Sequence, residues 1–153
     1  MALLIPNAGE TRILLELLDG GTARENWTLK LFSNNYAPAP ADTTGAYTEC
    51  NFTNYISKTL TRTISGSTWQ TITSGAPTAA WNAQAAVAKS SYGSSPLSWT
   101  CGVTGQTVYG YYVVGATSGV VIFAEAFATP RTLANGDSLS FSPAFEFGSG
   151  SGA

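Results

Sequence analysis

The stretch TVYGYYVVGATSGVVIFAEAFATP, residues 107–130, decides the fold class. Two runs of β-branched and aromatic residues flank the small residues 115–119, and this pattern predicts a β-hairpin. A hairpin with one face in water should alternate apolar and polar side chains. This one barely alternates, and Glu125 is the one charged residue in the stretch. We therefore expect both faces of the hairpin to be covered.

A turn over residues 115–120 would place Val114 opposite Val121 and Gly110 opposite Glu125. One face then carries bulky side chains that suit a core. The other carries tyrosines over alanines and suits a contact with another chain or with the N-terminal arm, because tyrosine combines apolar area with a polar tip. A slip of one residue would exchange the two faces. The contact residues expected on the second face are Tyr109, Tyr111 and Val113.

Other segments of the chain also have the composition of short strands with turn signals between them. Asn135-Gly136 is a strong turn signal. Pro143 lies within the strand expected after this turn and predicts that the strand is at an edge or has a bulge at that residue. About eight short strands of this kind are typical of a sandwich or a barrel. We expect a mainly β chain that forms a single jelly-roll-like β-sandwich, with an immunoglobulin-like sandwich as the alternative. The expected strands outside the hairpin are 27–35, 47–55, 56–65, 68–73, 97–101 and 138–147, with 78–96 extended or looped.

One short helix is predicted near the start of the chain, over residues 8–19. Asn7 followed by Glu10 approximates a capping box, and Gly20 and Gly21 are typical of a helix end. Apolar residues recur at helical spacing within it. A helix of about three turns is only marginally stable alone. We therefore expect its apolar stripe to dock on its own domain or on a neighbouring subunit. The stripe consists of Ile13, Leu14, Leu17 and Leu18.

The expected organisation is an N-terminal arm and helix over 1–21, a sandwich domain over 22–147 and a Gly/Ser tail over 148–153. Of the 153 residues only 10% are charged and the net charge is −2, against about 25% charged residues in an average domain. Such a weakly charged surface predicts that a partner covers part of it. No basic stripe suggests nucleic-acid binding, and no apolar run reaches the roughly 18 residues of a membrane span.

The chain contains no histidine, which excludes Ser-His-Asp and Cys-His catalysis. Cys50 and Cys101 lie too far apart for a zinc motif. We expect them to be buried thiols, with a disulfide as the alternative. We expect no cofactor and no metal.

Carboxylates could still support glycoside hydrolysis. Glu125 is the best candidate, because an apolar strand could raise its pKa. The presence of this carboxylate in an apolar strand is explained more simply by hydrogen bonds or by a basic partner such as Arg131. We therefore assign no catalytic residue and expect no enzyme. The candidate carboxylates are Asp42, Glu49, Glu125, Asp137 and Glu146.

Aromatic residues could form a stacking platform for a sugar. Trp69, Trp81 and Trp99 are the candidates. Aromatic side chains in a sandwich are core residues first, which weakens this hypothesis.

Three segments carry a resemblance to a known class of proteins. They are MALLIPNAGE at residues 1–10, NWTLKLFSNNYAPAPADTTGAYTECNF at 26–52, and SWTCGVTGQTVYGYYVVGATSGVVIFAEAFATPRTLANGDSLSFSP at 98–143. Together they resemble small virion structural proteins that tailed bacteriophages encode near their capsid genes. The resemblance spans residues 1–64 and 96–147.

The resemblance implies a capsid decoration, or cement, protein. It would form a homotrimer on the outside of the virion, bind the major capsid protein and be assembled in the host cytoplasm. The resemblance transfers no catalytic or ligand residue, because the matching segments are strands and turns. Three alternatives remain: a tail, baseplate or fibre component that could bind a glycan or a receptor, a small enzyme such as a glycosidase or lyase, and a non-viral binding module.

Overall fold

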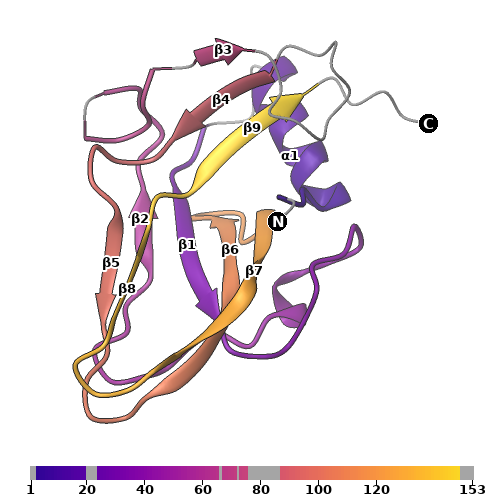
Figure 1. The fold of residues 1–153 in the computed structure, drawn as a ribbon. Coiled ribbons are helices and arrows are strands. Elements are labelled where there is room, and N and C mark those ends of the chain that lie inside the picture. The colour runs from indigo at the N-terminus through magenta and orange to yellow at the C-terminus, as the bar shows by residue number, and fades with distance from the viewer. Residues whose placement is uncertain (1–2, 20–23, 66, 72, 76–86, 149–153) are drawn as a thin grey trace. The chain divides into compact units, whose positions relative to one another are not determined.

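The computed structural model describes residues 3–19, 24–65, 67–71, 73–75 and 87–148 (Figure 1). Its described part is mainly β, with one α-helix, a single 3₁₀ turn at Thr44–Ala46, and strands that pair antiparallel. The elements are α1 (Asn7–Leu18), β1 (Trp27–Phe32), β2 (Lys58–Leu60), β3 (Thr73–Gly75), β4 (Val87–Ser91), β5 (Leu97–Thr100), β6 (Gln106–Gly115), β7 (Val121–Leu133), β8 (Ser138–Phe141) and β9 (Ala144–Gly148).

The chain divides into two compact units. The first contains residues 1–62 and 98–140, and the second contains residues 63–97 and 141–153. The first unit holds α1 and a four-stranded sheet in the order β2-β1-β6-β7, and β5 pairs with β8. The second unit holds a three-stranded sheet in the order β3-β4-β9. The expected division into 1–21, 22–147 and 148–153 stays a prediction.

Strand β6 lies in the middle of the four-stranded sheet, between β1 and β7 (Figure 1). Its residues 110–115 are all buried. On one face of the sheet, cross-strand pairing aligns Leu29, Val113 and Phe123, and each of these side chains is 0% exposed. The prediction of a hairpin without a water-facing side is therefore confirmed for this part of β6.

The opposite face of β6 is covered by the connection between β1 and β2. Phe32 and Tyr112 contribute to this face, and Tyr47 from the connection packs against both. The rings of Tyr47 and Tyr112 stack with centroids 4.7 Å apart and an interplanar angle of 12°. We expected another chain or the N-terminal arm on one face of the hairpin. At β6 the protein's own loop supplies this cover, and the N-terminal arm contacts the hairpin at β7, where Leu4 pairs with Ala124.

The hairpin register differs from the prediction by one residue. Val114 pairs with Val121 as expected, but an irregularity between Val113 and Val114 shifts the ladder beyond that point. Tyr111 consequently lies opposite Glu125, where Gly110 was expected. A β-bulge inserts an extra residue in one strand and so moves the following side chains relative to their partners.

Several expected strands are shorter, divided or absent. In 68–73 the described residues contain isolated bridges at Trp69 and the first residue of β3, but no strand of their own. The segment 47–55 contains an isolated bridge and no named strand, and 56–65 is reduced to β2. The segment 138–147 forms two strands, β8 and β9, which pair in different sheets on either side of the buried Pro143. Proline has no N–H to donate to a ladder, so an interruption at this residue is favoured.

Other expectations about the strands and turns agree with the described residues. The turn at Asn135-Gly136 is present, and Gly136 has a φ of 88°, a conformation that glycine adopts without strain. In the segment 78–96, the described residues 87–91 form β4. Residues 76–86 of the same region lie outside the described residues.

Helix α1 covers Asn7–Leu18, close to the predicted 8–19, but it begins differently. Its N-cap residue is Pro6, and no side chain makes a capping hydrogen bond. The expected capping box of Asn7 and Glu10 is therefore wrong, because Asn7 already lies inside the first turn. The expected end at Gly20 and Gly21 falls outside the described residues.

Substitution of Gly110 in β6 tests the close approach of β6, β7 and Phe32. A Cβ atom at this position would lie against the Glu125 carbonyl oxygen and 2.6 Å from the Phe32 ring. Because this overpacks the sheet, we expect Gly110→Ala to lower the free energy of unfolding by about 1–3 kcal/mol in urea titrations. Gly45→Ala is the control, since its Cβ would come no closer than 3.7 Å to Thr43. Equal stability of both variants would contradict the expectation.

Candidate functional site

The candidate site is an exposed apolar surface on α1. Four leucines of this helix are exposed to solvent: Leu14 by 54%, Leu15 by 43%, Leu17 by 67% and Leu18 by 82%. Leu15 was missed by the sequence reasoning, although it stands three residues before Leu18 and so shares its side of the helix. Ile13, which was predicted with the stripe, is partly buried and is not counted with this surface. We call this surface the leucine face, and it consists of Leu14, Leu15, Leu17 and Leu18.

The helix exposes its leucines because it docks through its other side. The buried residues of α1 are Gly9 and Glu16. Gly9 packs directly on the backbone of β7, where an added Cβ would lie 2.7 Å from the Val121 carbonyl oxygen. Only glycine allows a helix to approach a strand so closely. Just before α1, Leu4 exchanges two backbone hydrogen bonds with Ala124 of β7, at 3.0 and 2.9 Å.

Alternating charges bind the second half of the helix to the rest of the first unit. Arg12 Nε lies 3.0 Å from Glu16 Oε1, and Arg12 Nη2 lies 3.0 Å from Glu25 Oε1. Arg62 Nη1 donates to the other carboxylate oxygen of Glu16. The side chains of Glu16 and Glu25 are only 4% and 5% exposed. We call Arg62, Glu16, Arg12 and Glu25, in this order, the ionic network.

The ionic network also reaches the sheet. Glu25 Oε2 accepts hydrogen bonds from the backbone N–H groups of Thr117 and Ser118, in the turn between β6 and β7. Burial raises the pKa of Glu25, but these hydrogen bonds and the charge of Arg12 outweigh it and hold the pKa below the usual range. The Arg62 guanidinium lies over the Trp27 ring, 4.6 Å from its centroid. The network therefore joins α1 to β1 and to the hairpin turn.

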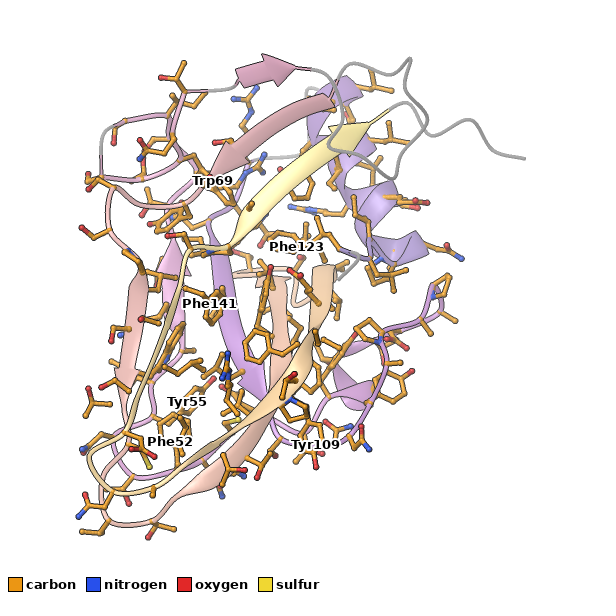
Figure 2. All side chains as sticks on the ribbon, in the orientation of Figure 1. Phe52, Tyr55, Trp69, Tyr109, Phe123 and Phe141 are labelled. Carbon is orange, nitrogen blue, oxygen red and sulfur yellow. The ribbon has the colours of Figure 1, made fainter. Side chains whose placement is uncertain are left out.

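The contact residues expected on β6 do not join the leucine face. Tyr111 is 3% exposed and Val113 is 0% exposed, so neither can serve as a surface in this structure. The Tyr111 hydroxyl donates to Glu125 Oε2 at 2.6 Å. Tyr109 is half-buried and packs against the cluster around Tyr112 (Figure 2). The shifted register changes the neighbours of this face, because Phe123 and Glu125 lie opposite Val113 and Tyr111 in place of the expected Ile122 and Ala124.

Most of the candidate carboxylates have structural partners. Glu125 accepts a hydrogen bond from the Tyr111 hydroxyl. Glu49 Oε2 accepts one from Lys30 Nζ at 2.8 Å. Asp137 accepts from the backbone N–H of Ala134. The side chain of Glu146 lies outside the described residues. These contacts tie loops and strands together.

Asp42 organises the loop that covers the second face of β6. Its carboxylate accepts hydrogen bonds at 2.6 Å from the hydroxyls of Tyr36 and Tyr47, and at 2.8 Å from the Ala39 N–H. Burial raises the pKa of Asp42, but these three donors outweigh it and lower the pKa. Asp42 thus fixes the ring of Tyr47 on the sheet.

The aromatic residues considered for a sugar platform are buried where they are described. Trp69 is 7% exposed and Trp99 is 2% exposed. Trp69 packs edge-to-face on Tyr92, and the Trp99 indole N–H donates to the Ile56 carbonyl (Figure 2 labels Trp69). Neither ring is open for stacking, so that hypothesis is wrong for both, and Trp81 lies outside the described residues.

The two cysteines are free and buried, which confirms the expected thiols and contradicts the disulfide alternative. Burial, with the nearby Glu49 charge, raises the pKa of Cys50 to about 12. In the described part of the chain, no group of three His, Cys, Asp or Glu side chains could hold a metal ion. No helix among the described residues is long and apolar enough to cross a membrane.

Comparison with known proteins adds no relative. No protein-family model matches the chain, and no curated protein matches it.

Removal of the Asp42 charge tests its role in the loop. We expect Asp42→Asn to lower the free energy of unfolding by about 1–3 kcal/mol at neutral pH, because Tyr36 and Tyr47 lose a charged acceptor. The folded-state pKa of Asp42 is lowered, so its stabilisation is present above the unfolded pKa and is lost as pH falls through the folded value. Urea titrations at several pH values should therefore show that the difference in free energy of unfolding between wild type and variant becomes smaller in acid. Glu10→Gln, on an exposed helix position, is the control, and a gap independent of pH would refute this role.

Proposed function

We propose that this chain is a virion structural protein of a tailed bacteriophage, of the capsid decoration type. In this role it binds the outer capsid surface and stabilises the shell without enzyme activity. The leucine face carries the proposal, since a contiguous set of exposed leucines is typical of a surface that a partner covers. The resemblance of residues 1–64 and 96–147 to small phage virion proteins supports the same role.

The proposal includes a finer description of the fold. We propose that the antiparallel strands belong to a single β-sandwich of jelly-roll type. The series of short antiparallel strands separated by turns supports this, because such a series is typical of a sandwich or a barrel.

The energetics of the leucine face suit such a partner. Fully burying one leucine side chain contributes about 1.5–3 kcal/mol, so the four leucines of α1 could contribute several kcal/mol to binding. A shell offers many equivalent positions, and self-association into a homotrimer would multiply the contacts of each subunit. Binding to the assembled shell then stabilises it by mass action. The major capsid protein is the proposed partner.

Electron microscopy of the parent virion tests the assignment. Subunit-sized density that fits the first unit is expected on the outer capsid, with α1 turned toward the neighbouring protein. Density for this chain on the tail or baseplate alone would overturn the decoration role and favour a tail, baseplate or fibre component. A glycan array would then separate a receptor-binding protein from a structural one.

Polar substitutions on the leucine face test its part in binding. We expect the triple variant Leu14→Ser, Leu17→Ser and Leu18→Ser to bind shells that lack the protein at least about a hundredfold more weakly, since roughly 3 kcal/mol of apolar burial is removed. Its free energy of unfolding should stay within about 0.5 kcal/mol of wild type, because the side chains are exposed. Cosedimentation with purified shells measures the binding.

Val103→Ser provides the matched control, since Val103 is 79% exposed but lies outside α1. It should bind as wild type does. Unchanged binding of the triple variant would remove the leucine face from the contact.

A further inference from the structure

Helix α1 is docked with its polar side inward and its apolar side outward. Amphipathic helices of globular proteins usually bury the apolar stripe. Here Glu16 is buried while Leu17 and Leu18 are 67% and 82% exposed. The attachment of the second half of the helix therefore depends on charge, because little apolar area is buried there.

The ionic network balances its charges only while both carboxylates are ionised. Glu16 lies between Arg12 and Arg62, with one oxygen for each guanidinium. Arg12 in turn lies between Glu16 and Glu25. Protonation of either glutamate leaves an excess positive charge in a partly buried place, and removal of one partner from a buried ion pair is strongly destabilising.

The two guanidiniums already repel one another. Burial and then the charge of Arg12 lower the pKa of Arg62. The carboxylate of Glu16 keeps them together, so this repulsion is released when that charge is lost. The contacts of the network come from several elements. They include Arg12 and Glu16 from α1, Glu25 before β1, Arg62 after β2, the Trp27 ring from β1, and Thr117 and Ser118 from the hairpin turn.

The first half of the helix is held by contacts that do not titrate. The Leu4–Ala124 backbone pair and the packing of Gly9 on β7 need no charge. Asn7 N–H also donates to the Pro40 carbonyl at 2.9 Å. A change in protonation would thus act on residues 12–18 and leave the start of the helix tethered.

We infer that the ionic network is an acid-sensitive latch, which holds residues 12–18 of α1 on the first unit at neutral pH and releases them when Glu16 and Glu25 take up protons. This conformational device goes beyond the proposed function and requires no partner. Release would free the leucine face from its fixed orientation while the helix stays attached at Leu4 and Gly9. Because the pKa of Glu25 is lowered, release is expected below about pH 4, the ordinary range of glutamate.

Hydrogen exchange of the full chain, followed by mass spectrometry and corrected for intrinsic rates, tests the latch. Between about pH 7 and about pH 3, protection in peptides from α1 should fall at least about tenfold, while peptides from β6 keep their protection. Loss of protection in α1 and β6 at the same pH would indicate global acid unfolding and overturn the proposal.

Variants at neutral pH separate the latch from general acid effects. Glu16→Gln should lower the protection of α1 at least about tenfold with β6 unchanged, because Arg12 and Arg62 lose the charge between them. Glu10→Gln, on the same helix but outside the network, is the matched control and should behave as wild type. An α1 protection in Glu16→Gln equal to that of the control would overturn the latch.

A double variant distinguishes charge balance from packing. Arg62→Met added to Glu16→Gln restores a balanced pair of Arg12 and Glu25. We expect it to recover part of the α1 protection that Glu16→Gln loses, as charge coupling requires in a double-mutant cycle. If the double variant is less protected than Glu16→Gln alone, the network acts by packing and the proposal fails.

Discussion

The pairing of β6 with β1 and β7 is the constraint on which the first unit depends. A strand buried on both faces must have its backbone N–H and C=O groups satisfied within the sheet, because no water reaches them. Strand β6 therefore needs both β1 and β7 as hydrogen-bonding neighbours, and it needs side chains packed on each of its two faces. Leu29 and Phe123 belong to one side, and Tyr47 covers the other. The Asp42 carboxylate is the link that makes the second cover rigid.

The parts of the fold that follow from local pattern were predictable. The hairpin, β1 and α1 each lie close to the expected residues. The bulge next to Val114 was not predictable, because a run that is apolar on both faces gives no alternation to fix the register. The segment 47–55 has strand-like composition but lies where Tyr47 stacks on Tyr112, a contact between residues far apart in sequence. Tertiary packing there overrides β-propensity.

The candidate site was predictable in composition and not in orientation. The spacing of Leu14, Leu17 and Leu18 indicates an apolar helix side, and the usual assumption is that this side faces the core. The opposite signal is present in the sequence: Gly9, Arg12 and Glu16 recur at helical spacing on the other side. Only the fold reveals their partners, since Glu25 and Arg62 reach them from either end of the β1–β2 region.

The position of these partners has a consequence for the order of folding. Gly9 packs on β7, and Glu25 caps a turn at residues 117 and 118, so the docking surface of α1 is assembled from segments that leave the ribosome about a hundred residues later. Contacts of such long range form late, because the loop between them must close first. The helix is thus synthesised before the surface on which it docks. Until the hairpin exists, a nascent chain exposes both the charged and the leucine sides of α1.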